Sequence, residues 1–425
     1  MPLRSWFVVA LASAGALVAC NAIIGVEDVK LKQSFVPRAD SGPPPGDDDD
    51  DDDDDSGEVP FDETERPTIA LGYNHGCARM LDSTVRCWGD NGAGQIGDGE
   101  PFGGTRENVL RPKSVPNVSD AIAIASGLAH TCIVRKGGAV SCWGVNSFGQ
   151  LGDGTTNRSS APVDVIGITN AVAVSGGNST TCALLADKTI SCWGYNGSGN
   201  LGDGTKTSSS RPVKVKGVSN AKAVAAAADH TCALVGDGDV VCWGSNATGQ
   251  LGIGSDDAGA GIGPVKLSLS DVTQVVAAAK FACALEASGR VYCWGANDKG
   301  QLGNGAASPE PNPSPILVSD VTDAKHVWAG IDHACAVRAT GAVMCWGFAG
   351  QGQLGIGAVE ANDKKDAPVQ ARGVVAARAV ATGGDRTCVV LADDKAVCFG
   401  ANTLGQLGNG STDRALTATP ISDFP

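Results

Sequence analysis

A pair of cysteines ten residues apart recurs seven times in this chain and limits its fold more than any other feature. The pairs are Cys77 with Cys87, Cys132 with Cys142, Cys182 with Cys192, Cys232 with Cys242, Cys283 with Cys293, Cys335 with Cys345, and Cys388 with Cys398. Successive first cysteines are 55, 50, 50, 51, 52 and 53 residues apart. A period of about 50 residues is typical of propellers and solenoids, whose repeats are single supersecondary units. We therefore expect one repeat architecture over residues 66–425.

The segment between two paired cysteines predicts a β-hairpin. In the second copy, a three-residue turn at residues 136–138 places Cys132 opposite Cys142. The third residue of such a turn takes a left-handed conformation that suits glycine, and glycine stands there in four of the seven copies. Opposed residues on antiparallel strands have Cα atoms about 4.5–5.5 Å apart, within disulfide range. We expect each pair to form a cross-strand disulfide within its own hairpin.

A histidine two residues before the first cysteine raises the alternative of a metal site, because residues i and i+2 share one face of a strand. These histidines are His75, His130, His230 and His333. In the other copies Thr180, Phe281 and Arg386 take their place while the cysteine pairs stay intact. We therefore expect structural, hydrogen-bonded histidines, no bound metal and no cofactor.

Each repeat contains four short strand-like segments, which is the content of a propeller blade. We predict an all-β fold, a seven-bladed β-propeller of four-stranded antiparallel blades. Small residues such as those at 121–125 suit the innermost strand. The tryptophan after the second cysteine, replaced by Phe399 in the last copy, suits packing between blades. The C-terminal segment 419–424 resembles the first strand of a blade that lacks its second. Residues 68–71 are expected to supply that strand, so that one blade closes the ring from both chain ends.

The N-terminus has the pattern of an export signal. An apolar run from Trp6 to Val18 is too short to span a bilayer comfortably. Residues 17–20, Leu-Val-Ala-Cys, resemble the lipobox of bacterial lipoproteins. This resemblance implies a signal peptide at residues 1–19 and lipid attachment at Cys20, the cysteine outside the seven pairs. An ordinary signal peptide with an incidental cysteine is the alternative. Export fits the expected disulfides, which persist in oxidising compartments.

Residues 20–65 are expected to form a disordered, acidic tether. Nine consecutive aspartates occupy residues 47–55 and cannot bury themselves. A solvated spacer is the favoured interpretation, and weak calcium binding is the alternative. Residues 21–65 hold sixteen acidic and three basic residues, so the net charge of −14 belongs mainly to this segment. The body at residues 66–425 is nearly neutral and has no basic block, which argues against nucleic acid as a partner.

The string Cys-Trp-Gly-x-Asn-x-x-Gly-Gln-Leu-Gly at residues 142–152, 242–252 and 293–303 resembles the RCC1-type (regulator of chromosome condensation) repeat. The resemblance covers residues 66–425 and implies a seven-bladed propeller. The eukaryotic founder is a nucleotide-exchange factor that binds chromatin and uses a wedge inserted in one blade. Here the largest surplus between repeats is five residues, which leaves little room for a wedge. Other bacterial members are secreted binding proteins, including an inhibitor of β-lactamase, so protein recognition is the better analogy.

Binding is expected at the loops that vary between copies, because a rigid repeat scaffold displays such loops on one face. They are residues 101–111, 255–263, 306–315 and 358–367, with Phe102, Phe148, Tyr195 and Phe348 as candidate partner-binding aromatics. No catalytic residues are identified, and we expect a monomeric, lipid-anchored envelope protein, at the outer membrane or cell surface, that binds a protein or envelope component. One alternative is a hydrolase or lyase acting on envelope polysaccharide. The other is a passive structural protein.

Lipidation at Cys20 predicts a specific processing defect. An inhibitor of signal peptidase II should leave an unprocessed precursor, because cleavage before a lipidated cysteine depends on that enzyme. Gel mobility and intact mass would measure the precursor, and a Cys20→Ser variant would provide the control. Normal processing under the inhibitor would show that residues 17–20 are not a lipobox.

Overall fold

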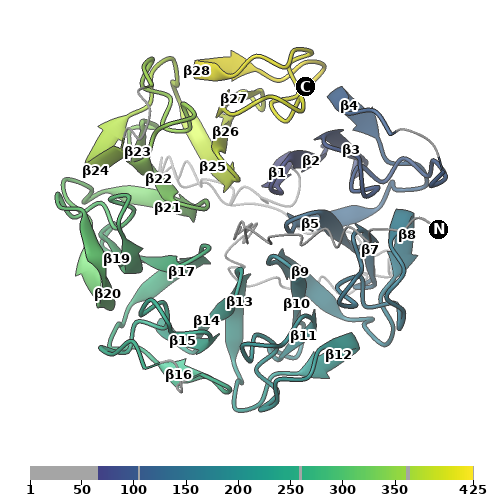
Figure 1. The fold of residues 1–425 in the computed structure, drawn as a ribbon, viewed down its shortest axis with the longest axis horizontal. Coiled ribbons are helices and arrows are strands. Elements are labelled where there is room, and N and C mark those ends of the chain that lie inside the picture. The colour runs from purple at the N-terminus through teal and green to yellow at the C-terminus, as the bar shows by residue number, and fades with distance from the viewer. Residues whose placement is uncertain (1–65, 104–105, 258–260, 360–363, 425) are drawn as a thin grey trace, which may run out of the picture.

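The computed structural model describes residues 66–103, 106–257, 261–359 and 364–424. These residues form 28 strands in seven four-stranded sheets, arranged as a closed ring around a central axis (Figure 1). The predicted all-β, seven-bladed propeller is confirmed. Within these ranges no helix is long and apolar enough to cross a membrane. Cys20, the signal peptide and the acidic tether lie outside the described residues.

Each blade consists of four consecutive antiparallel strands, and we number the blades 1–7 in chain order. The innermost strands are β1 (Thr68–Leu71), β5 (Ala121–Ser126), β9 (Ala171–Gly176), β13 (Ala221–Ala226), β17 (Val272–Ala277), β21 (Ala324–Ala329) and β25 (Ala377–Gly383). The second strands are β2 (His75–Arg79), β6 (His130–Arg135), β10 (Thr180–Leu185), β14 (His230–Val235), β18 (Phe281–Glu286), β22 (His333–Arg338) and β26 (Arg386–Leu391).

The third strand of each blade carries the second cysteine, and the fourth forms the rim. The third strands are β3 (Val85–Gly89), β7 (Val140–Gly144), β11 (Ile190–Gly194), β15 (Asp239–Gly244), β19 (Val291–Asn297), β23 (Val343–Phe348) and β27 (Ala396–Gly400). The fourth strands are β4 (Val109–Ser114), β8 (Ser159–Asp164), β12 (Ser209–Lys214), β16 (Val265–Lys266), β20 (Ser308–Leu317), β24 (Lys364–Gln370) and β28 (Ala415–Pro420).

The seven predicted disulfides are confirmed, each between the two middle strands of its own blade. They join Cys77 to Cys87, Cys132 to Cys142, Cys182 to Cys192, Cys232 to Cys242, Cys283 to Cys293, Cys335 to Cys345, and Cys388 to Cys398. The paired Cα atoms are 4.0–4.1 Å apart. This is slightly closer than the roughly 4.5 Å of directly opposed residues in a non-hydrogen-bonded antiparallel pair.

The cysteine hairpins also have the predicted register. Cys132 pairs directly with Cys142, and the other six copies repeat this pairing. The third turn residue has a positive φ in every copy, including the three without glycine, Ser83, Lys188 and Asp394. The turn geometry is therefore set by the hairpin and not by the residue type.

The predicted blade assembled from both chain ends is wrong. β28 pairs with β27 in blade 7, and β1 pairs with β2 in blade 1, so every blade is continuous in sequence. The segment taken for the first strand of a repeat is the fourth strand of the preceding blade, as in the pairing of Cys142 with Val163. Blades 7 and 1 therefore close the ring by packing and hydrogen bonding between complete sheets.

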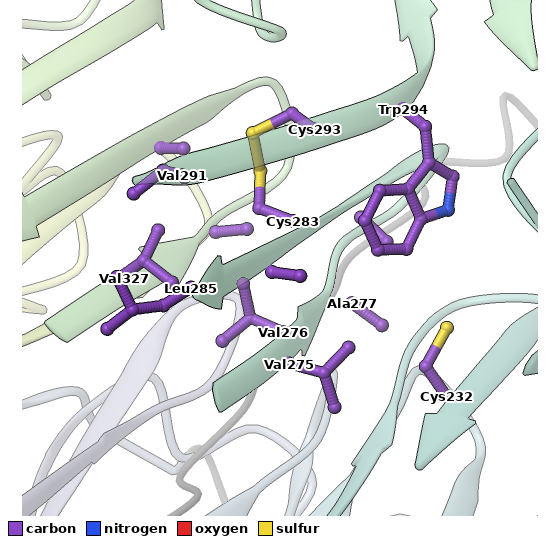
Figure 2. Close-up of a cluster of buried hydrophobic side chains, with 14 of the residues drawn as sticks. Cys232, Val275, Val276, Ala277, Cys283, Leu285, Val291, Cys293, Trp294 and Val327 are labelled. Carbon is purple, nitrogen blue, oxygen red and sulfur yellow. A yellow bond between two sulfur atoms is a disulfide. The ribbon is translucent and has the colours of Figure 1, made fainter. Parts of the chain in front are cut away.

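Tryptophans hold neighbouring blades together, as predicted. The Trp143 indole is fully buried, and its Nε1 donates to the carbonyl of Gln95 in blade 1 at 2.9 Å. The same bond joins Trp193, Trp243, Trp294 and Trp346 to the preceding blade, and Trp88 to Gln406 of blade 7 at 3.0 Å. In Figure 2, Trp294 of blade 5 extends toward Cys232 of blade 4. Blade 7 has Phe399 at this position, which cannot donate this bond.

The repeated histidines also link blades. His130 Nε2 lies 2.9 Å from Thr181 Oγ1 in the next blade, and that hydroxyl donates to the carbonyl of Gln150 at 2.8 Å. Since the hydroxyl proton is used there, the histidine donates from Nε2. Burial lowers the pKa of His130 to about 4, so the ring is neutral at neutral pH. A Cβ at Gly127 would lie 2.0 Å from the ring, so glycine leaves the space that the histidine fills.

The same unit of glycine, histidine and next-blade threonine is broken in blade 4. Ala227 stands at the glycine position and Ala282 at the threonine position. Within the described residues, neither ring nitrogen of His230 has a hydrogen-bond partner. Burial lowers the pKa of His230 to about 3, which keeps this unpartnered ring neutral. The histidine bond therefore accompanies a glycine in its own blade and a threonine hydroxyl in the next.

Arg386 takes the histidine position in blade 7 and secures the closing interface. Its guanidinium donates to the carbonyl of Tyr73 at 2.6 Å and to that of Gly72 at 3.1 Å, and also reaches the carbonyl of His75. All three acceptors belong to blade 1 or to the loop before β2. The next-blade position that holds threonine in four of the blades is Gly76 here. A charged donor with several backbone acceptors thus replaces the histidine bond at the junction of the two chain ends.

Two threonines at matched positions isolate the histidine bond. Thr181→Val removes the partner of His130, whereas Thr231→Val removes a hydroxyl that donates only to the carbonyl of Asn200 at 3.1 Å. The preceding blade of Thr231 carries Thr180 in place of histidine. We expect Thr181→Val to lower the free energy of unfolding by about 1 kcal/mol more than Thr231→Val, since a buried donor loses its partner. Denaturant unfolding would measure both, and equal losses would contradict the interblade bond.

Candidate functional site

Two sets of loops lie on one face of the ring, which we call the loop face. The inner loops join first and second strands, and the outer loops join third and fourth strands. In every blade a backbone N–H at or just after the end of the third strand donates to the carbonyl of the residue before the second strand, at 2.7–2.9 Å. Examples are Tyr195 to Ser179 and Phe348 to Asp332. The opposite face, which we call the turn face, carries the three-residue turns and the links between blades. The loop face therefore collects most positions that differ between copies.

Two of the four predicted aromatics form a pair on the loop face. The rings of Phe148 in blade 2 and Tyr195 in blade 3 meet edge to face, with centroids 5.1 Å apart and planes at 72°. The side chain of Phe148 is 44% exposed, while Tyr195 is half-buried. An exposed aromatic supported by a second ring has the character of an interface anchor. We call these two residues the aromatic pair.

The other two predicted aromatics do not join this pair. Phe102 lies in the blade 1 loop, and the guanidinium groups of Arg106 and Arg158 lie over its ring, 5.1 and 4.1 Å from the centroid. Arg106 is bound in turn to the buried carboxylate of Asp98 at 2.5 Å. Phe348 lies in blade 6, across the ring from the aromatic pair (Figure 1). Phe102 therefore already has two cationic partners, and the four aromatics make no single surface.

Carboxylates just before the second strands also lie on the loop face, and the sequence analysis did not predict them. The residue just before each second strand is Asn74, Ala129, Ser179, Asp229, Lys280, Asp332 or Asp385 in blades 1–7. Charge at this position is therefore confined to blades 4–7. Three of those four residues are aspartates, and Asp298 of blade 5 lies in an outer loop nearby. Alignment of the repeats at this one position was the sequence signal that could have found them.

The environment raises the pKa of the inner aspartates. Burial, and then the negative charges of Asp298 and Asp385, raise the pKa of Asp332 to about 6, against the weaker opposing effect of Lys299 and Lys280. Burial also raises the pKa of Asp385, although Arg386 opposes it. Asp332 therefore exchanges a proton near neutral pH.

Asp298 and Tyr73 complete this electrostatic group. Burial works to raise the pKa of Asp298, but hydrogen bonds from Gln301 and Lys299 outweigh it and hold the pKa below its ordinary value. Burial, followed by the charges of Asp385 and Asp332, raises the pKa of the Tyr73 phenol. Two carboxyls with a raised pKa, Asp332 and Asp385, and one with a lowered pKa, Asp298, thus lie on neighbouring blades, and we call these three residues the acidic arc.

The described residues offer no ready metal centre. Across the four described ranges, no group of three or more His, Cys, Asp or Glu side chains could hold a metal ion. The paired cysteines are consumed in disulfides. Three of the four repeated histidines contact threonine hydroxyls of the next blade, at 2.9–3.0 Å. The arrangement suits recognition by aromatic and charged side chains.

Comparison with known families identifies the repeat. Two models, both described as the regulator of chromosome condensation (RCC1) repeat, match this chain. One matches residues 137–184, 191–234, 237–285 and 288–337. The other matches residues 68–95, 121–150, 171–200, 221–250, 272–301 and 377–406. Together these matches span more than half of the chain.

Curated relatives share part of their length with this chain. It is 35% identical over 156 residues to the ultraviolet-B receptor UVR8 of Arabidopsis thaliana, covering 36% of this chain and 35% of that protein. It is 33% identical over 138 residues to the human regulator of chromosome condensation, covering 32% of this chain and 33% of that protein. The chain thus matches about a third of the length of each of these two relatives.

Solved structures support the fold over a longer stretch. Human WBSCR16 superposes with a TM-score of 0.70 at 21% identity, covering 80% of this chain and 94% of that one. Yeast RCC1 (Prp20), solved with Kap60, superposes with a TM-score of 0.70 at 21% identity, covering 85% and 86%. At these identities the likeness shows the fold alone.

The raised pKa of Asp332 predicts that the Asp332→Asn substitution stabilises the fold by an amount that depends on pH. A carboxyl whose pKa rises on folding stabilises the fold at low pH and loses that contribution as pH rises through about 6. Asp332→Asn should therefore raise the free energy of unfolding by about 1–2 kcal/mol at pH 8, after allowance for solvent screening, and by little at pH 4. Thermal or denaturant unfolding at both pH values would measure it. Asp256→Asn, at an exposed carboxylate, is the control, and an equal gain at both pH values would contradict the assignment.

Proposed function

The chain belongs to the RCC1 repeat family, and on that premise we propose that it is an exported, lipid-anchored binding protein whose loop face recognises a protein or envelope component. The body supplies a rigid scaffold, because disulfides staple every blade and buried tryptophans join the blades. Cys20 supplies the anchor, and residues 20–65 separate it from the body. The ring then presents its loop face to a partner in the envelope.

The uneven chemistry of the loop face carries this proposal. The aromatic pair stands on blades 2 and 3, while the acidic arc stands on blades 5–7. The residues beneath them, by contrast, repeat from blade to blade. Exposed aromatics with a supporting contact are enriched among residues that dominate binding energy. Charged groups on the same face add orientation and partner selection.

Relatives support recognition as the class of function. The yeast RCC1 structure was solved with Kap60 bound, and a second Prp20 structure is described by its binding to Gsp1p and histones. Those partners belong to those proteins. What supports the proposal here is that the same fold serves protein recognition elsewhere, on loops carried by a similar scaffold.

A hydrolase or lyase acting on envelope polysaccharide is the second candidate. Asp332, with a pKa of about 6, faces the charge of Asp298, whose pKa is held low. Two carboxyls with pKa values pushed apart are the general requirement for an acid and base at neutral pH. Release of reducing ends from purified envelope polysaccharide, lost in Asp332→Asn, would favour this candidate over recognition.

Capture from native envelopes tests the recognition proposal. The full-length protein should capture a partner. The double variant Phe148→Ala and Tyr195→Ala should capture at least about tenfold less of it, because anchor residues contribute about 2 kcal/mol or more to binding. Leu81→Ala is the matched control, since this residue is 49% exposed on the turn face. Quantitative mass spectrometry would compare the captured proteins and glycans. Equal capture by all three proteins, or capture of nothing, would contradict a role for this face and would favour a passive structural protein.

A further inference from the structure

Every titratable side chain in the innermost strands is basic. Lys222 in β13, Lys325 and His326 in β21, and Arg378 in β25 are these residues, and the seven inner strands contain no aspartate or glutamate. The corresponding second residues of β5, β9 and β17 are Ile122, Val172 and Thr273, which are uncharged. The innermost strands of blades 4, 6 and 7 therefore carry cations.

Three of these cations stand at β-bulges. The register with the second strand shifts across residues 221–223 in β13, 324–326 in β21 and 377–379 in β25. The residue in each gap is Lys222, Lys325 or Arg378. A bulge leaves its extra residue unpaired in the ladder and redirects its side chain. All three bulges lie at the start of an inner strand, which is the end of the channel at the turn face.

The chain enters the propeller at this same end. Arg378 Nη2 donates to the carbonyl of Pro67 at 3.3 Å and lies 3.4 Å from Asp394. Arg66 Nη1 lies 3.6 Å from the same carboxylate. The first described residues thus contact Arg378, one of these inner-strand cations. We call Arg66, Lys222, Lys325 and Arg378 the basic mouth.

Two lysines of the basic mouth retain capacity for an anion. Lys222 Nζ lies 3.7 Å from Asp237, a carboxylate exposed to solvent, and such pairs contribute little. Lys325 is exposed, and its ammonium pairs with no carboxylate among the described residues. The arginines are engaged by Asp394, so the lysines are the groups that an added anion would reach.

The nine aspartates at residues 47–55 are the nearest large negative charge in the sequence. Residue 55 precedes Arg66 by eleven positions, and a fully extended segment of that length reaches about 36–40 Å. Attachment to the same chain gives the run an effective concentration of about millimolar at a site within reach. Even a weak electrostatic contact is then populated.

We propose that the aspartate run at residues 47–55 docks against the basic mouth of its own propeller. These residues lie outside the described ones, and the inference rests on the cations that face them and on the place where the chain enters. The contact would hold the turn face against the tether and leave the loop face exposed on the opposite side of the ring. It stands independently of the proposed recognition function, because no loop-face residue takes part.

Carbodiimide crosslinking of the full-length protein tests the contact, because it joins a carboxylate to an amine only where the two meet. At low salt, mass spectrometry should find residues 47–55 joined to Lys222 or Lys325 within one chain. Lys136 and Lys188, exposed in turns of the same face, are the matched controls. The crosslinks should disappear in Lys222→Gln combined with Lys325→Gln, and at about 0.5 M salt, where screening acts within a few ångströms. Equal crosslinking to Lys136 and Lys188, or none to Lys222 and Lys325, would overturn the proposal.

Amine acetylation gives a second measurement that does not need a crosslink. Replacement of all aspartates at 47–55 by asparagine should speed acetylation of Lys222 and Lys325 by about two- to fivefold, as expected for loss of a weak tethered contact, and leave Lys136 unchanged. Vesicles of anionic lipid added to that variant test an external occupant. If the acetylation rates of Lys222 and Lys325 do not change on removal of the aspartates but fall when vesicles are added, the basic mouth binds a membrane. That result would overturn the intramolecular contact.

Discussion

The bond between a tryptophan indole and the backbone carbonyl of the preceding blade is the interaction on which the rest of this structure depends. It joins six of the seven pairs of neighbouring blades and includes the closing step, where Trp88 donates to Gln406. A propeller blade contacts only its two neighbours, so stability accumulates through such interfaces. Each of these indoles is fully buried and donates a directional hydrogen bond across the interface between two blades. The loop face inherits its rigidity from these contacts.

The histidine unit shows how residues in neighbouring repeats compensate for one another. His130 needs the space left by Gly127 and the hydroxyl of Thr181, which lies in another blade. Where Ala227 and Ala282 take those places, His230 loses its partners. At the junction of the chain ends, Arg386 reaches the carbonyls of blade 1 instead. Differences between copies are therefore of two kinds. Some change the hydrogen bonds between neighbouring blades, and others change the side chains on the loop face.

Much of the fold could be predicted because local rules repeat seven times. Cysteine spacing and the turn position set the hairpin register, and small residues marked the innermost strands. The closure was wrong because the rim segment pairs backward with its own hairpin, and alternating residues do not reveal the direction of pairing. At the candidate site, Phe148 and Tyr195 meet as neighbours, whereas Phe102 and Phe348 are separated by the ring. The acidic arc was missed because its members come from different repeats, and the packing of blades 5, 6 and 7 against one another brings Asp298, Asp332 and Asp385 together.

The sequence by itself determined the repeat, the disulfide pairing and the number of blades, because these depend on spacing within one copy or between adjacent copies. The tertiary structure alone decided which side chains share a face, which histidines find a partner and how far burial shifts each carboxyl. Those properties arise between blades. They depend on the distance and solvent exclusion that a closed ring imposes on residues far apart in the chain, and no spacing within one repeat contains that information.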